Sequence, residues 1–464
     1  MKLKKVISKF NSYNLLLCLF CLLVIVLAFL SLHKRYGHDE FEAIHTSWKM
    51  LQGERIYEDF FQHHHPFLYY LIAPIIMIFK ERIITIIAIR IMIFMMLLLI
   101  FLGVYLISTK FFNKETAIIS LILLSTTIIF VERAVEIRPD VPQTLFGVFS
   151  IFFLLCYFEN KSGKHLALSS ISLGLSFLFL QKAIFLIFFV GILLIVNTLN
   201  KNMNYRNLLK YMFVFMATVV PYYIFVVSTC SLSTYYKFNW FINMKFIFHF
   251  STFKFLIESF QDNLLIWTFW ILSTLFYLKK PDHKQLGLLS LGLLVSLFFV
   301  RTPFPQYFML SVSLIAILSA HAIYSIFKTK RTMINVLLIV SLSYPSYSLF
   351  IKIKNPSNHP QLRKIKYVLS ITDHNDFVYD GDIWFNVFRK DIDFFWFSVR
   401  PNDGALATYQ TFAKYDYNIY ELIHKYKPKV ISNNFIDNMK DSRISDYYEV
   451  SSYYKDLFIR SDRK

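Results

Sequence analysis

The sequence predicts an all-α protein that crosses a membrane many times and ends in a small α/β domain. Hydrophobic residues make up 56% of the 464 residues and charged residues only 17%, against about 25% charged in average soluble domains. Runs of Leu, Ile and Phe recur along the first three quarters, and many approach the ~20 residues needed to cross a bilayer. After residue 351, VLSITDHNDFVYDGDIWFNVF and KPKVISNNF are patterned like short strands, and turn residues and the helix-like stretch YNIYELIHKY separate them. We therefore predict a membrane domain over 1–351 and a soluble domain over 352–464.

About eleven segments are predicted to span the membrane. They are 13–32, 84–108, 116–131, 141–158, 166–181, 184–198, 208–228, 263–279, 285–300, 306–327 and 332–351. A further apolar segment, PFLYYLIAPIIMIF at 66–79, is short and contains Pro66 and Pro74. Segments of about 10–14 residues are more often re-entrant or interfacial than spanning, so we predict that 66–79 does not cross.

Basic residues between the spans support this topology. If 66–79 does not cross, every loop on the side of the N-terminus carries a basic cluster, as the positive-inside rule requires. If it crosses, all clusters except the first face outward. We expect a bacterial inner-membrane protein with a cytoplasmic N-terminus and an extracytoplasmic C-terminal domain. The net charge of +19 then reflects topology rather than nucleic-acid binding.

The same topology gathers the unusual polar residues on one face. The outer loop 33–83 contains Asp39, Glu40 and three consecutive histidines at 63–65. Apolar residues at helical spacing in HDEFEAIHTSWKML predict an interfacial helix that begins near Asp39. Carboxylates are favourable at a helix N-terminus, so capping alone is an alternative interpretation. Further predicted outer positions hold Arg138, Asp140, Lys182, Arg301 and Tyr307.

This set of side chains suits one kind of chemistry. A carboxylate can act as general base toward an acceptor hydroxyl or amine. Lysine and arginine can hold the phosphate of a lipid-linked donor and stabilise its charge as it leaves. A short re-entrant segment and interfacial aromatic residues would shape a groove for the lipid. The pattern indicates sugar transfer from a polyprenyl-phosphate carrier, although Lys182 could also simply snorkel to the interface.

Several of these segments resemble the GT-C glycosyltransferases. The resemblance is to the bacterial branch related to the protein O-mannosyltransferases and to the lipid A aminoarabinose and galacturonic acid transferases. The first outer loop of this branch has an Asp-Glu pair, an amphipathic helix, G-x-x-x-Y-x-D-F and H-P-P-L. Here Gly53, Tyr57, Asp59 and Phe60 match the third element, and His65-Pro66-Phe67-Leu68 match the fourth, with Phe67 for the second proline. RPDVPQTLF at 138–146, QKAIFL at 181–186 and RTPFPQYFML at 301–310 resemble later elements in the same order.

The resemblance implies a site and a reaction. It implies inverting transfer of a monosaccharide from a polyprenyl phosphate to an envelope acceptor, which is a lipid or a protein, on the extracytoplasmic face. Asp39 takes the position of the essential acid that acts as general base or orients the acceptor, with Glu40 in support, and Asp140 takes that of the second essential acid. The predicted donor-phosphate and substrate ligands are Arg138, Lys182, Arg301, Tyr307, His64, His65 and Tyr57.

One departure from the branch bears on the donor and on metal binding. The aminoarabinose transferases have Glu-Lys where this chain has His64 and His65, which argues against aminoarabinose and favours Lys182 or Arg301 as phosphate ligand. Histidines near Glu132 could bind zinc, but we expect no cofactor and no required metal. The alternatives are a transporter or flippase of a lipid-linked saccharide, a polysaccharide polymerase or ligase, and a non-catalytic scaffold.

Overall fold

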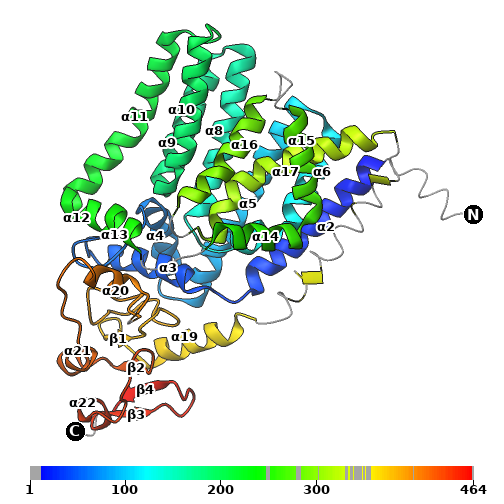
Figure 1. Cartoon of the computed structure of the whole chain (residues 1–464). Helices are drawn as coiled ribbons and strands as arrows, with labels where there is room; N and C mark the ends of the chain where they lie inside the picture. Colours follow the sequence, from blue (N-terminus) through cyan, green and yellow to red (C-terminus); the bar gives the residue numbers. More distant parts are fainter. Residues whose placement is uncertain are drawn as a thin grey trace, which may run out of the picture. The chain divides into compact units, whose positions relative to one another are not determined.

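The computed structural model confirms a predominantly helical chain with a small C-terminal sheet (Figure 1). It describes residues 12–246, 251–277, 284–300, 303–329, 357–400 and 402–461, with 333, 334, 338, 347, 348 and 351. Most of the predicted span 332–351 and the predicted ligand Arg301 lie outside this set. The chain divides into two compact units: unit 1 comprises 1–34, 90–222 and 250–356, and unit 2 comprises 35–89, 223–249 and 357–464.

The helices before the tail run in the predicted order. They are α2 (Ser12–His33), α3 (His38–Leu51), α4 (Phe67–Phe79), α5 (Ile83–Phe111), α6 (Lys114–Thr126), α7 (Ile128–Ala134), α8 (Asp140–Asn160), α9 (Gly163–Phe179), η1 (Gln181–Ala183), α10 (Ile184–Leu199), α11 (Tyr205–Thr229), α12 (Leu232–Tyr236), η2 (Lys237–Phe241), α13 (Ile242–Lys245), α14 (Thr252–Asp262), α15 (Leu264–Tyr277), α16 (Lys284–Ser296), η3 (Leu297–Phe299), η4 (Pro305–Phe308) and α17 (Met309–Phe327).

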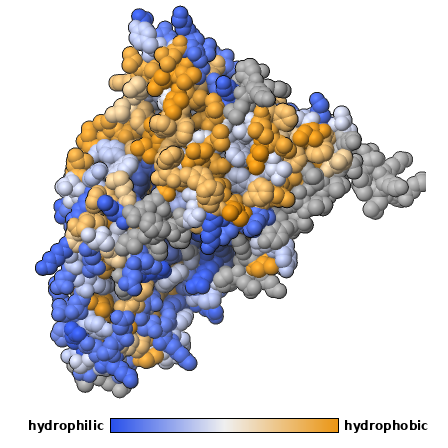
Figure 2. All heavy atoms as spheres, viewed as in Figure 1, coloured by the Kyte–Doolittle hydropathy of each residue, from blue (hydrophilic) through white to orange (hydrophobic). Residues whose placement is uncertain are grey.

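Within the described residues, six helices are long and apolar enough to cross a membrane, or seven if the bent pair α6–α7 is one span. Their outer surfaces keep large apolar side chains exposed, such as Phe213 at 74% and Ile224 at 66%. Hydrophobic residues gather over these helices in Figure 2. Exposed apolar area of this extent marks contact with lipid, so the protein is a multi-pass membrane protein. Helix α4 has thirteen residues, fewer than a span needs.

Two spans form the centre of unit 1. In the apolar stretch of α8, 72% is buried inside the protein, and the same share is buried in that of 305–327, which includes α17. In the apolar stretch of α11 only 11% is buried. Helix α17 packs against α6, α8, α15 and α16, and α8 packs along α9. Helices α8, α9 and α10 run beside one another in Figure 1.

The predicted span 116–131 is broken rather than straight. Helices α6 and α7 meet at Thr127 with a bend of 74°. The side chain of Asn263 accepts a hydrogen bond from the N–H of Ile128 and donates one to the carbonyl oxygen of Thr126, both at 2.9 Å. Interrupted backbone at membrane depth requires such internal partners, and this asparagine supplies them.

The tail forms the predicted α/β structure. Its elements are α19 (His359–Ile371), β1 (Val378–Tyr379), α20 (Ala405–Gln410), α21 (Ile419–Tyr426), β2 (Val430–Ser432), α22 (Ser442–Ser445), β3 (Tyr448–Val450) and β4 (Leu457–Arg460). The sheet order is β1-β2-β4-β3; β1 and β2 are parallel and the other pairs antiparallel. The predicted helix in YNIYELIHKY is confirmed as α21.

One expectation for the tail is met only in part. The pattern of VLSITDHNDFVYDGDIWFNVF predicted short strands, but its first residues end α19 and only Val378–Tyr379 form a strand. After β1 the carboxylate of Asp380 accepts hydrogen bonds from the backbone N–H groups of Trp384, Phe385 and Asn386. Because one side chain satisfies three consecutive donors, the backbone folds into a loop instead of extending along a sheet.

Unit 2 joins the first outer loop to the tail. The ring of His45 on α3 lies 2.9 Å from the carbonyl oxygen of Val387 and 2.8 Å from the carboxylate of Asp391. The ammonium of Lys49 donates to the same carboxylate at 2.9 Å. Although burial raises the pKa of Asp391, the neighbouring His45 and Lys49 lower it overall. The helix predicted to be interfacial is therefore buried against tail residues along much of its polar face.

Candidate functional site

The N-terminus of α3 presents the predicted carboxylate pair. The helix begins at His38, one residue before the predicted start, and Gly37 is its N-cap residue. The backbone N–H of Gly37 donates to Glu40 Oε1 at 3.0 Å, which is the carboxylate half of a capping box. Glu40 is fully buried. Its side chain is thus used to fix the helix end that carries Asp39.

Asp39 remains accessible beside a histidine. Its Oδ1 lies 2.7 Å from Nε2 of His38, and its side chain is 30% exposed. The negative charge of Asp39 raises the pKa of His38 to about 9, so this imidazole is cationic at neutral pH. Asp39 is therefore a partly exposed carboxylate at a fixed helix terminus, which is a suitable position for a general base.

Unit 1 brings three other predicted residues to one cavity. Asp140, Lys182 and Tyr307 line a cavity of about 40 Å³ that is partly open to solvent. Asp140 begins α8, Lys182 lies in η1, and Tyr307 lies in η4. The Lys182 ammonium lies 3.3 Å from the centroid of the Tyr307 ring. The remaining wall consists of Gln143, Leu180, Phe185, Leu186, Leu293, Ser296, Leu297, Val300, Leu310 and Ser311.

The wall of this cavity combines polar and charged side chains with apolar ones. An ammonium group held over an aromatic ring is attracted by the ring's negative face, so Tyr307 helps to fix the direction of Lys182. A lysine can pair with a phosphate, and leucine, valine and phenylalanine side chains suit an isoprenoid. The chemical character of these side chains suits the phosphate end of a lipid.

Arg138 belongs to an ion cluster next to this cavity that is centred on the buried carboxylate of Glu136. The Glu136 carboxylate, in the turn between α7 and α8, contacts Lys34 at 2.5 Å, Arg133 at 3.1 Å and Arg138 at 3.3 Å. Nε of Arg138 lies 3.8 Å from Asp140 Oδ2. Burial raises the pKa of Glu136, but Lys34, Arg133 and Arg138 outweigh it and lower the pKa to about 2. Arg138 thus links the ion cluster to the cavity carboxylate.

Two predicted substrate ligands are engaged inside unit 2. Tyr57 is fully buried; its hydroxyl donates to the carbonyl oxygen of His64 and accepts from Asn239 at 2.8 Å. His65 is also fully buried, and its Nε2 lies 2.9 Å from the hydroxyl of Tyr235. These contacts hold the loop before α4. A direct contact of either residue with substrate stays a prediction.

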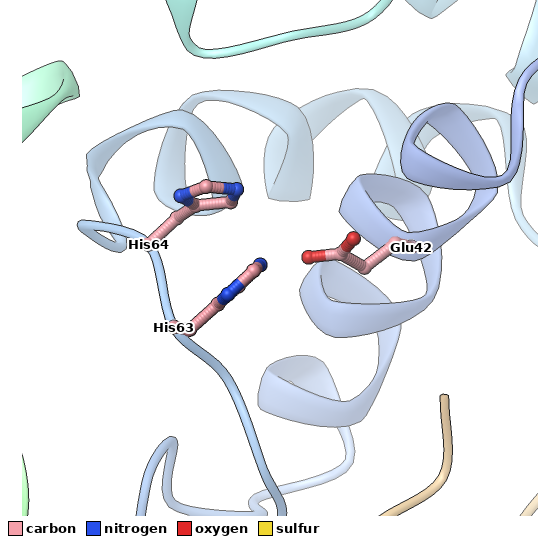
Figure 3. Close-up of side chains that lie close together, drawn as sticks. All are labelled: Glu42, His63 and His64. Atoms are coloured by element: carbon pink, nitrogen blue, oxygen red, sulfur yellow. The ribbon is translucent and has the colours of Figure 1, made fainter. Parts of the chain in front are cut away.

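Glu42, His63 and His64 form a cluster that could hold a metal ion. One ligand atom from each lies within 4.8 Å of the others, and Figure 3 shows the three side chains directed toward a common space. Glu42 is 3% exposed. Neither Glu42 nor His63 was among the predicted site residues. The spacing in the sequence could have indicated Glu42, since it lies one helical turn after Asp39 on the predicted helix.

The predicted residues thus fall into two groups. Unit 1 holds Arg138, Asp140, Lys182 and Tyr307, of which the last three line one cavity. Unit 2 holds Asp39, Glu40, Tyr57, His64 and His65. His64 and His65 lie in the loop before α4, and the hydroxyl of Tyr57 donates a hydrogen bond to that loop.

The sequence matches one known protein family over part of its length. Residues 63–225 match the family described as dolichyl-phosphate-mannose-protein mannosyltransferase. The matched segment contains Arg138, Asp140 and Lys182. No curated protein sequence matches the chain.

Solved structures match over nearly the whole chain. ArnT from Cupriavidus metallidurans bound to undecaprenyl phosphate has a TM-score of 0.68 at 12% identity, covering 96% of this chain and 97% of that one. The oligosaccharyltransferase from Archaeoglobus fulgidus in its apo form has a TM-score of 0.56 at 13% identity, covering 90% and 69%. The oligosaccharyltransferase AglB from the same organism, in complex with an inhibitory peptide and a dolichol phosphate, has a TM-score of 0.55 at 13% identity, covering 97% and 74%. At these identities the likeness concerns the fold.

Proposed function

The chain has the fold of the GT-C glycosyltransferases, and from this premise we propose that it transfers a monosaccharide from a polyprenyl phosphate to an envelope acceptor. The observation that carries the proposal is the unit 1 cavity, where Asp140, Lys182 and Tyr307 share a wall with leucine, valine and phenylalanine side chains. A polyprenyl phosphate is complementary to this wall, because it has an anionic head for Lys182 and an apolar chain for the apolar side chains. Similar structures have been solved with undecaprenyl phosphate and with dolichol phosphate bound, which supports this class of lipid.

Each residue has a proposed role. Lys182 pairs with the donor phosphate, and Arg138 with Asp140 shapes the polar part of the donor site. Arg301 is proposed as a second phosphate ligand. Asp39 takes the proton from the acceptor hydroxyl or amine as the acceptor attacks the anomeric carbon. The bond from that carbon to the phosphate oxygen breaks, the lipid phosphate leaves with the electron pair, and the anomeric configuration inverts.

The proposed reaction is extracytoplasmic. The N-terminus is cytoplasmic and the tail lies outside a bacterial inner membrane, as the basic loops favour. The acceptor is a lipid or a protein of the envelope. No step of transfer requires a metal ion.

Envelope glycans provide the test. We expect a strain without this chain to lose one sugar residue from an envelope molecule and to accumulate the lipid-linked donor, both measurable by mass spectrometry. The wild-type chain should restore the glycan and Asp140→Asn should not. Asp416→Asn, which changes an exposed carboxylate of the tail, is the matched control and should restore it. Unchanged glycans combined with a changed distribution of lipid-linked saccharide between the leaflets would contradict transfer and favour a flippase.

A further inference from the structure

We propose that Glu42, His63 and His64 bind one divalent cation of the zinc class. Two imidazole nitrogens and one carboxylate oxygen converge here, with ligand atoms within 4.8 Å of one another (Figure 3). Imidazole and carboxylate are ligands that zinc takes in proteins. Around a tetrahedral ion with bonds of about 2.1 Å, ligand atoms lie roughly 3.4 Å apart. Small rotations of the three side chains therefore close the site.

The two histidines are placed unusually for neighbours in the chain. Consecutive side chains of extended backbone point to opposite sides. Here the chain bends at His64, and the ring centroids of His63 and His64 lie 4.1 Å apart. Both rings consequently point toward the buried carboxylate of Glu42.

The surrounding contacts fix the backbone of both histidines. The side-chain oxygen of Gln62 accepts hydrogen bonds from the N–H groups of His63 at 2.7 Å and His64 at 3.3 Å. Its amide nitrogen donates to Thr46 on α3 at 2.9 Å, and Thr46 lies one turn after Glu42. Gln62 therefore ties the histidine segment to the helix that carries the third ligand.

Two further side chains hold the carbonyl groups of this segment. Asn243 donates to the carbonyl oxygen of His63 at 2.7 Å, and the hydroxyl of Tyr57 donates to that of His64. Such supporting contacts position ligands before binding and reduce the entropic cost of assembling a site.

The ion would have a positioning role. Three protein ligands leave one coordination position open to water or an oxyanion. Glu42 lies three residues after Asp39, so the ion joins the histidine segment to the helical turn that follows the proposed general base. This inference is independent of the transfer reaction, because metal binding is measured without donor or acceptor.

The direct test is metal content. The purified full chain, with its affinity tag removed, is stripped with chelator, incubated with zinc sulfate, freed of unbound metal and analysed by plasma mass spectrometry. We expect about one zinc per wild-type chain, and on the order of tenfold or greater loss of affinity in Glu42→Gln and in His63→Ala/His64→Ala. His424→Ala removes an exposed histidine of α21 and should bind like the wild type. Equal zinc content in the double variant and the wild type would overturn the proposal, as would no zinc in the wild type.

Two measurements separate loss of ligands from loss of fold. Zinc should raise the unfolding temperature of the wild-type chain because it binds the folded state, and should not raise that of folded Glu42→Gln. Cobalt(II) in the same site should give the visible absorption of a four-coordinate ion. Inorganic phosphate should change this spectrum through the open position. A six-coordinate spectrum that is identical in wild type and Glu42→Gln would refute the site.

Discussion

The Lys182 ammonium and the Tyr307 ring show how single residues define the proposed donor site. Their separation of 3.3 Å directs the cation within a cavity that also contains Asp140. In unit 2, Asp39 is held by the capping contact of Glu40 and by its pair with His38. Sequence motifs predicted all of these residues except His38. His38 belongs to no motif, and its pairing with Asp39 is seen only in the distance between the two side chains.

Lys182→Ala should chiefly impair use of the lipid-linked donor. Loss of a charge-assisted contact costs about 1.5–3 kcal/mol, so we expect the apparent KM for the donor to rise roughly tenfold to a hundredfold. Tyr307→Phe keeps the ring and should change little, whereas Tyr307→Leu should have an intermediate effect. Lys164→Ala, at an exposed position of α9, is the control. A change confined to acceptor affinity would refute the phosphate role.

At the scale of elements, apolar periodicity predicted most helices correctly. It placed α3 within one residue of its start and identified α21, since both have one apolar face at helical spacing. It did not predict the break between α6 and α7. That break depends on Asn263, 135 residues after Ile128, and periodicity within a segment contains no information about so distant a partner.

The Glu136 cluster joins the end of α2, α7 and the start of α8. Glu136→Gln removes the buried counter-charge that buried Arg138 shares with half-buried Lys34 and Arg133. We expect a loss of about 3–5 kcal/mol in unfolding free energy. The pKa of Glu136 is lowered from 4.5 to about 2, so its stabilising effect is complete above about pH 4.5 and disappears as the pH falls toward 2. Thermal unfolding in detergent should show the difference between wild type and variant shrinking over this range. A difference that is constant from pH 7 to pH 3 would contradict the ion cluster.

Close packing of α9 against α11 gives a second prediction at this scale. A Cβ atom added at Gly174 would lie 2.8 Å from Cγ2 and 2.9 Å from Cβ of Thr218. Since Cβ moves only with the backbone, Gly174→Ala should overpack the contact and cost about 1–3 kcal/mol. Gly191→Ala, where the added Cβ has no neighbour within 4 Å, should not destabilise the fold. Similar unfolding temperatures for the two variants would show that the two helices do not pack this closely.

At the scale of the whole molecule, composition and basic loops predicted a polytopic membrane protein with an α/β tail. The division expected at residue 351 differs from the two compact units, because unit 2 also includes 35–89 and 223–249. The buried ion group that joins α3 to the tail explains the difference. His45 and Asp391 are 346 residues apart in the chain, and no local pattern marks them as partners. Ion pairs between residues so far apart in the chain could not be predicted from the sequence, and the structure was needed to find them.

The measurement that tests the account most directly follows the lipid product of the purified chain. In nanodiscs supplied with donor and acceptor lipids from the native envelope, mass spectrometry should detect conversion of polyprenyl-phosphate sugar into polyprenyl phosphate. Asp39→Asn, at equal amount and equal unfolding temperature, should be slower by about 10²–10⁴-fold. Undiminished release by Asp39→Asn, or release of polyprenyl diphosphate by the wild type, would contradict the proposed reaction.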